Sequence, residues 1–229
     1  MGWFQFKGKN SKDFGILISS VPQQTRPERR VEHITIPGRH GDLTEDEETY
    51  EPYTISLECS TRGSDKLDEI VAWLNGAGEL ILSTEPDKVY RASIYNKISI
   101  ADVIYLYNSF LLQFRVQPFK YSVNAFGDGL ELTKATTVFN SGTYASQPII
   151  TVYGSGDITL HINGVDFPLY GVEESITIDS EMMEVFKGTK NQNSKYGGED
   201  FPKLEVGENI VSWTGDVEKV VIEPRWRWL

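Results

Sequence analysis

Alternation of apolar and polar residues runs through most of this chain and constrains its fold more than any other feature. The stretch YTISLEC (53–59) puts Ile55, Leu57 and Cys59 on one face and polar side chains on the other. LQFRVQP (112–118) repeats the pattern. Successive side chains of a strand point to opposite faces, so these segments are expected to be half-buried antiparallel strands. Shorter strands are predicted at 15–19, 33–36, 79–83 and 89–95. The chain is therefore predicted to be mainly β.

One segment has the period of a helix. SDKLDEIVAWLNGAG (64–78) places Leu67, Ile70, Val71 and Leu74 at positions i, i+3, i+4 and i+7, which forms one apolar stripe. Ser64 is suited to cap the start of such a helix, and Asn and Gly residues follow its end. The sequence predicts one helix over about 64–76, packed on the first β-domain.

The composition changes near residue 124. Residues 124–148 are rich in Gly, Ser, Thr and Asn, which suits an interdomain passage. A second series of strands follows, with a turn predicted at GSGD (154–157), a tight hairpin at Asn163-Gly164 and a long polar loop over 187–200. Further strands are expected at 175–179, 209–215 and 217–224, the spacing of a sandwich. The predicted domains are 1–132 and 133–229.

The stretch IPGRHGDL (36–43) is similar to a phosphate-binding loop, because Gly38 and Gly41 flank Arg39 and His40. A phosphate loop needs a helix N-terminus directly after the glycines. Here the sequel is acidic and leads into a strand, so a turn or exposed loop between strands is predicted. The acidic run 45–48 lacks the alternating ligands and central Gly of an EF-hand, and a solvated loop tip is expected there.

Composition argues against several kinds of site. Cys59, the one cysteine, excludes an internal disulfide and a Cys-based zinc cluster, and its place on an apolar face predicts a core residue. The chain has three histidines and no G-x-S-x-G elbow. A net charge of −11 disfavours a surface that grips nucleic acid. We therefore predict no catalytic residues, no metal site and no cofactor.

Neither membrane insertion nor secretion is predicted. No apolar stretch is long enough to span a bilayer. The N-terminus lacks a cationic segment followed by an apolar one, so no signal peptide is expected.

Several segments, taken in order, resemble one family over nearly the whole chain: the distal tail proteins of long-tailed, non-contractile bacteriophages (siphophages). The first half shows an aromatic N-terminal strand, GWFQFKGKNSKDFGI, and the Arg-containing VPQQTRPERR. The IPGRHGDL turn, YEPYTISLEC, the helix DKLDEIVAWLNGAGEL and STEPDKVYRASI follow. The second half shows FNSGTYASQPIITVYGSGDITLHING, ITIDSE, FPKLEVGENIVSW and VVIEPRWRWL.

The resemblance implies an architecture and a role. The first domain would be a β-barrel or sandwich-like, ring-forming domain with one helix, and the second a galectin-like β-sandwich outside the ring. Six copies would form the ring, and in isolation two rings would pair back to back as a dodecamer. The ring would be a hub at the distal end of the tail in the virion, made in the host cytoplasm. It would join the major tail tube protein to the tail-associated tip protein and hold receptor-binding proteins. Phage DNA would pass through the lumen without specific binding.

Two sets of residues are candidates for contacts. A ring subunit needs complementary faces that differ from each other, and the loop 39–52 is predicted to reach a neighbouring subunit through Arg39, His40, Asp42, Glu45 and Asp46. The alternative function is a carbohydrate-binding module that attaches to cell-wall polysaccharide through the second domain. Its sugar-facing or partner-docking loop would contain Asn191, Asn193 and Tyr196.

Two other functional interpretations, aromatic sugar platforms and a hydrolase, have weaker support in the sequence. Trp213, Trp226 and Trp228 could serve as sugar platforms, but packing in the core is favoured for Trp213 and an edge strand or docking segment for PRWRWL. A cell-wall hydrolase is supported only by the abundance of acidic residues, 33 in all.

Overall fold

The computed structural model describes residues 2–20, 25–61, 67–95, 109–123 and 129–229. The chain divides into two compact units, Met1–Lys120 with Leu229 and Tyr121–Trp228. This division falls earlier than the predicted boundary after residue 132. One reason is that strand β10 (Leu130–Leu132) pairs with β17 (Gly207–Glu223) of the second unit, so these residues already belong to the second sheet.

The first unit is built on an antiparallel sheet in the order β2-β1-β7-β8-β9-β6-β3. The two stretches with the clearest alternation form β6 and β9, which lie side by side with Tyr53 opposite Val116. The shorter predicted strands are also present. The bounds are β1 (Phe4–Phe6), β2 (Lys9–Asn10), β3 (Ile16–Ile18), β6 (Tyr53–Thr61), β7 (Gly76–Leu82), β8 (Glu85–Ile94) and β9 (Ser109–Ser122).

One face of this sheet is buried beneath a helix and a short 3₁₀ segment, η1 (Ser11–Phe14). Trp73 at the end of the helix stacks on Phe14 with ring centroids 4.5 Å apart and on Phe4 at 5.5 Å. Its indole N–H donates to the carbonyl oxygen of Phe6 at 2.7 Å. Cys59 is fully buried in the same core, as predicted.

The described part of the helix, α1, spans Leu67–Trp73, inside the predicted range, and Ser64 lies outside the described residues. Ile70 and Leu74 are buried as predicted, but Val71 is half exposed. Trp73 is buried instead, because its large ring fills the space between Phe4 and Phe14. The predicted stripe was therefore wrong at Val71.

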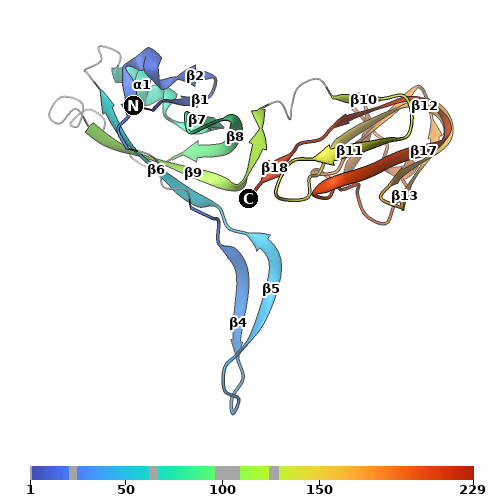
Figure 1. Cartoon of the computed structure of the whole chain (residues 1–229), viewed down its shortest axis with the longest axis horizontal. Helices are drawn as coiled ribbons and strands as arrows, with labels where there is room; N and C mark the ends of the chain where they lie inside the picture. The colour runs from blue at the N-terminus through green and yellow to red at the C-terminus, as the bar shows by residue number, and fades with distance from the viewer. Residues whose placement is uncertain (1, 21–24, 62–66, 96–108, 124–128) are drawn as a thin grey trace. The chain divides into compact units, whose positions relative to one another are not determined.

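A separate two-stranded antiparallel sheet, here called the hairpin arm, consists of β4 (Arg29–Thr35) and β5 (Asp42–Tyr50). Figure 1 shows it leaving the other strands of its unit and ending in a narrow turn. The prediction of an exposed loop over 39–52 was therefore wrong for most of its length. In the acidic run 45–48, Glu45 and Asp46 pair with β4 and the next two residues lie at the register shift within β5, so the run is not a loop tip.

The second unit is a sandwich whose strands belong to one continuous sheet, with β12 and β17 running through it. Asn163 and Gly164 both have positive φ and form the predicted tight hairpin. The predicted polar loop over 187–200 contains a short strand and a 3₁₀ turn. The remaining bounds are β11 (Thr136–Asn140), β12 (Ile149–Ile162), β13 (Val165–Val172), β14 (Ser175–Asp179), β15 (Glu184–Lys187), β16 (Lys190–Asn191), η3 (Asn193–Lys195) and β18 (Arg227–Trp228).

Register shifts divide β12 and β17 into halves that have different neighbours. The first half of β12 pairs with β14 and the second with β13, while β17 pairs first with β11 and then with β10. GSGD (154–157) is therefore a bulge inside one strand, and the predicted hairpin turn there was wrong. Likewise 209–215 and 217–224 form one strand. At the shift the backbones approach so closely that a Cβ on Gly154 would lie 2.2 Å from the carbonyl oxygen of Asp216.

The C-terminal segment is fastened by a buried ion pair. Arg225 donates two hydrogen bonds to Asp179, at 2.8 and 3.0 Å, and both side chains are about nine-tenths buried. Burial alone would raise the pKa of Asp179. Hydrogen bonds from Arg225 and from the backbone N–H of Met182 outweigh it and hold that pKa below its ordinary value. Trp226 then packs against the sandwich core.

We predict that Gly215→Ala lowers the free energy of unfolding of the second unit by about 3 kcal/mol. Gly215 has a φ of 104°, and a Cβ there would lie 2.6 Å from the carbonyl oxygen of Asp157, so strain and a backbone clash add. Gly156→Ala is the matched control, because its φ is 78° but nothing lies within 4 Å of the added carbon. It should cost only about 1–2 kcal/mol. Urea unfolding followed by tryptophan fluorescence measures both, and equal losses would contradict the clash.

Arg225→Ala should lower the free energy of unfolding by about 3–5 kcal/mol at pH 7, because it leaves the buried carboxylate of Asp179 unpaired. The pKa of Asp179 is depressed in the folded protein, so its stabilisation is present above the unfolded pKa of about 3.9 and is lost as pH falls further. The variant should therefore lose less stability than the natural chain as the pH falls below about 3.9. Lys203→Ala, which breaks the exposed pair with Asp200, is the control and should change little.

Candidate functional site

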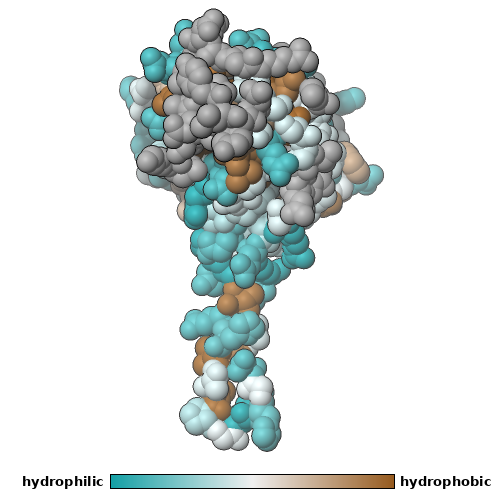
Figure 2. Space-filling view, turned by 90° about the vertical axis from the view of Figure 1, so that its left-hand side faces the viewer, coloured by the Kyte–Doolittle hydropathy of each residue, from teal (hydrophilic) through white to brown (hydrophobic). Residues whose placement is uncertain are grey.

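The hairpin arm has two distinct faces. Ile34 pairs directly with Leu43 on one face, next to a second cross-strand pair, Glu32 with Glu45. We call this face, with Ile36 at the turn, the apolar face of the arm. Leu43 is 45% exposed and Ile36 37% exposed, although both are large hydrophobic residues. Figure 2 shows hydrophobic side chains spaced along the arm between polar ones.

The end of the arm is the turn predicted from IPGRHGDL. Gly38 and Gly41 have φ values of 82° and 77°, which only glycine adopts without strain. The N–H of Arg39 donates to the carbonyl oxygen of Ile36 at 3.1 Å and closes the turn. Asp42, the first residue of β5, accepts a hydrogen bond from Thr35 at 3.2 Å.

The five predicted contact residues do not form one cluster. Arg39, His40 and Asp42 lie at the tip, whereas Glu45 and Asp46 lie within β5 and point to opposite faces. Asp46 is already paired, because Arg29 donates to it at 2.7 Å. That hydrogen bond holds the pKa of Asp46 below its ordinary value. Glu45 and the tip residues thus remain the candidates for contacts with a partner.

The solvent face of the first sheet is a second candidate surface, which our sequence reasoning missed. The residues opposite the buried ones in β6 and β9 are mostly uncharged and polar, with Thr54 across from Arg115 and Ser56 across from Gln113. Two shallow grooves of about 490 and 380 Å³ cross this face and share Ser93 and Tyr95. The same alternation that predicted the strands could have identified this face.

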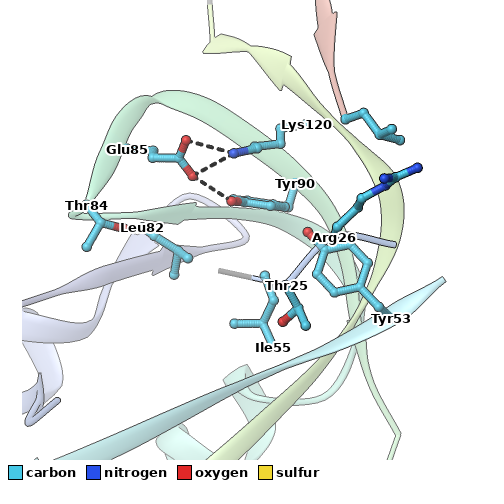
Figure 3. Close-up of a pocket in the computed structure, with 10 residues that line it drawn as sticks. Thr25, Arg26, Tyr53, Ile55, Leu82, Thr84, Glu85, Tyr90 and Lys120 are labelled. Atoms are coloured by element: carbon cyan, nitrogen blue, oxygen red, sulfur yellow. Dashed lines mark hydrogen bonds and ion pairs between the residues drawn. The ribbon is translucent and has the colours of Figure 1, made fainter. Parts of the chain in front are cut away.

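A pocket of about 260 Å³ in the first unit holds an ion-pair cluster (Figure 3). The ammonium of Lys120 donates to both carboxylate oxygens of Glu85, at 2.8 and 3.0 Å, and the hydroxyl of Tyr90 donates at 2.8 Å. Lys88 adds a bond at 3.2 Å.

The protonation of this cluster is set by burial and by its own hydrogen bonds. Burial would raise the pKa of Glu85, but the donors, Lys120 first, lower it below its usual range. Burial, with the charge of Glu85, raises the pKa of Tyr53 on the pocket wall to about 12. An ionised carboxylate held by three donors stabilises the sheet and is poorly suited to proton transfer.

The structure also bears on nucleophilic catalysis, metal binding and membrane insertion. Burial raises the pKa of the Cys59 thiol to about 12, which disfavours a thiolate nucleophile. Within the described ranges no group of three or more His, Cys, Asp or Glu residues could hold a metal ion. Among the described helices none is long and apolar enough to cross a membrane.

The loop predicted to face a sugar or a partner uses its polar atoms internally. The side-chain oxygen of Asn193 accepts the N–H of Val185 at 2.6 Å, and that of Asn191 accepts the N–H of Asn193 at 3.0 Å. Tyr196 stacks on Phe201 at 4.9 Å and donates its hydroxyl to the carbonyl oxygen of Asp200. These hydrogen bonds shape the loop, and the side chains of Asn191 and Asn193 remain exposed.

The tryptophans of the second unit have structural contacts. Trp213 and Trp226 pack against the sandwich core, as favoured for Trp213. In the C-terminal segment, Arg227 donates to the carbonyl oxygen of Ala145 at 2.6 Å and to the side chain of Gln147 at 3.0 Å.

Comparisons with known proteins agree with this architecture. Residues 8–116 match the family model of the phage tail protein RIFT-related domain. None of the curated proteins matches the chain. Among solved structures, the crystal structure of the Dit protein of phage SPP1 has a TM-score of 0.74 at 16% identity, and the similarity covers 100% of both chains. That protein is described as a paradigm of the hub adsorption apparatus in phages that infect Gram-positive bacteria.

The predicted resemblance to distal tail proteins and the predicted mainly β fold are confirmed. The match to the family model carries the resemblance in the first unit, and the shared fold carries it over the whole length. Residues 8–116 thus match the phage tail protein RIFT-related domain, and the whole chain has the fold of the SPP1 Dit protein.

Proposed function

We propose that this chain is a structural protein of a phage tail whose copies close into a ring, the hub at the distal end that joins the tail tube to the host-adsorption apparatus. The tail-domain match over 8–116 and the fold shared with SPP1 Dit support the tail assignment. Six copies is the number that the resemblance implies. The observation that carries the ring is the hairpin arm.

The arm has the properties of an assembly element. Neither strand contributes a buried residue to the hydrophobic core of the first unit. A two-stranded hairpin alone is only marginally stable in water, so an arm of this length is expected to gain stability from a partner. Closed rings are built from two different complementary surfaces on each subunit. The arm supplies one of them.

The polar sheet face is the surface we assign to the channel. DNA must move through a hub without being held, which requires a surface without dense positive charge. Residues such as Thr54, Ser56 and Gln113 meet this need, and the positive charge of Arg115 is accompanied by acidic Glu58 on the same face. Phage DNA would then pass by without specific binding.

The proposed ring has partners on several surfaces. The two faces of the ring would bind the major tail tube protein and the tail-associated tip protein, and the sandwiches would hold receptor-binding proteins. The protein would act in the tail of the virion. This role requires assembly and no catalysis or cofactor.

The mass of the purified chain in solution tests the ring. We expect light scattering after size exclusion, across a tenfold range of concentration, to give about six or twelve times the 25.9 kDa of one chain. Negative-stain images of the same fraction should show closed rings. A monomer at every concentration would contradict assembly of the isolated chain.

An arm-shortened variant tests the role of the arm. Arg29 and Tyr50 are directly paired, so Arg30–Thr49 can be replaced by Asn-Gly, which closes a two-residue hairpin. We expect the free energy of unfolding to change by less than about 1 kcal/mol, because the arm buries no core residue, while the oligomer is lost. A shortened chain that still assembles would show that the ring, if it forms, does not need the arm.

A further inference from the structure

We propose that the apolar face of the arm in one copy binds the lysine tip of the next copy, a surface formed by Lys7, Lys9 and Lys12. This inference rests on the proposed ring and names the two surfaces that meet in it. The charge and exposure of the two surfaces and their positions in the first unit support it.

The apolar face needs a partner that is both apolar and positively charged. Leu43 is exposed and Ile34 opposite it is only partly buried, although large apolar pairs are normally covered. Beside them Glu32 and Glu45 are directly opposite, and like charges in that position destabilise a strand pair. Among the described residues neither carboxylate forms an ion pair. A cation from outside would remove this repulsion.

The net charge of the whole arm also favours a positively charged partner. Residues 29–51 contain three arginines and seven carboxylates, a net charge of −4 with neutral histidine. Arg29 and Arg30 are used in pairs with Asp46 and Glu51 at its base. Two such arms would repel each other, so an arm-to-arm contact between copies is disfavoured.

The lysine tip offers the complementary chemistry. Lys7 lies at the turn between β1 and β2, Lys9 in β2 and Lys12 in η1, and all three are exposed. The ammonium groups lie over aromatic rings, Lys9 at 5.9 Å from Phe14 and Lys12 at 5.9 Å from Trp3. Among the described residues none of the three pairs with a carboxylate.

The ammonium of Lys7 also donates to the backbone carbonyl of Asn75, whereas no such bond is made by Lys9 or Lys12 among the described residues. Residues 7–13 contain three lysines and one aspartate, a net charge of +2 in a chain of net charge −11. The aliphatic stems of the lysines add apolar surface beside their charge. The tip therefore provides both properties that the apolar face of the arm requires.

The two surfaces lie on different sides of the first unit. The arm emerges from the chain between the neighbouring strands β3 and β6. The sheet curls round so that Ile18 of β3 is bridged to Gly2, just before β1, and Figure 1 shows β2 on the side of the unit away from the arm. A head-to-tail contact joins opposite sides of successive subunits, and repetition of that contact closes a ring.

Charge reversal tests the contact. Glu32→Lys/Glu45→Lys and Lys9→Glu/Lys12→Glu should each raise the concentration needed for half-assembly at least about tenfold, because like charges then face each other. The chain that carries all four substitutions should assemble within about threefold of the natural chain, since attraction is restored with its sign exchanged. Light scattering at about 0.1 M salt measures assembly, and circular dichroism checks the fold of every variant.

Glu208→Lys/Glu218→Lys is the matched control. These exposed glutamates lie on β17 in the second unit, and the change in net charge equals that of the arm variant. Assembly should not change. If it weakened as much, net charge and not the arm contact would govern assembly, and the inference would be overturned.

The remaining outcomes separate this inference from the proposed function. A natural chain that assembles, with both reversed variants assembling equally well, overturns the contact and leaves the ring standing. Loss in the arm variant without loss in the lysine variant, or failure of the fourfold variant to recover, overturns the lysine tip as the partner. A natural chain that stays monomeric overturns the proposed self-assembly and this contact with it.

Discussion

The first unit depends on the burial of Trp73. Its ring lies between Phe4 and Phe14, and its N–H satisfies the carbonyl of Phe6, so one side chain joins the helix, the first strand and the 3₁₀ segment. Aromatic stacking adds about 0.5–1.5 kcal/mol per pair to the burial itself. The same contacts hold the segment that carries the three lysines against the edge of the sheet. Trp73 thus stabilises the core and positions the surface that we assign to a neighbouring copy.

Alternation in the sequence was sufficient to predict the strands that bury one face. It identified β6, β9 and the shorter strands, because in such strands the apolar side chains face the core and the polar ones face solvent, as Leu57 and Ser56 do. It failed for β5, where every residue but the last is exposed and no contrast exists. Acidic residues are also poor strand formers, so that strand exists because the turn at Gly38 and Gly41 brings it back onto β4.

Two other errors have a common cause. A glycine-rich sequence is compatible with either a turn or a bulge. Residues 154–157 form a bulge because the segments on both sides of them pair with β17, about sixty residues later in the chain. In the helix, the burial of Trp73 in place of Val71 depended on the rings of Phe4 and Phe14, which lie about sixty residues earlier in the chain. Both outcomes were set by partners that a local pattern does not contain.

The candidate site was predictable in part for the same reason. Its tip residues, Arg39 and His40, were found because the turn has a local signature. The pairing of Asp46 with Arg29, and the opposition of Glu45 to Glu32, follow from the register of the hairpin, which a one-residue slip would change. The lysine tip became relevant only when the structure showed the arm leaving the unit on the side away from β2 (Figure 1).

This arrangement has a consequence for how a ring would form. A rigid core carries an arm that has little stability of its own, so docking the arm must also order it, which lowers the affinity of a single contact. Attraction between the acidic arm and the lysines speeds encounter more than it strengthens the complex. A ring of such contacts is stable once every subunit is held on both sides, whereas an open chain of subunits leaves one arm and one tip unsatisfied. Weak single contacts therefore favour the closed assembly over partial ones.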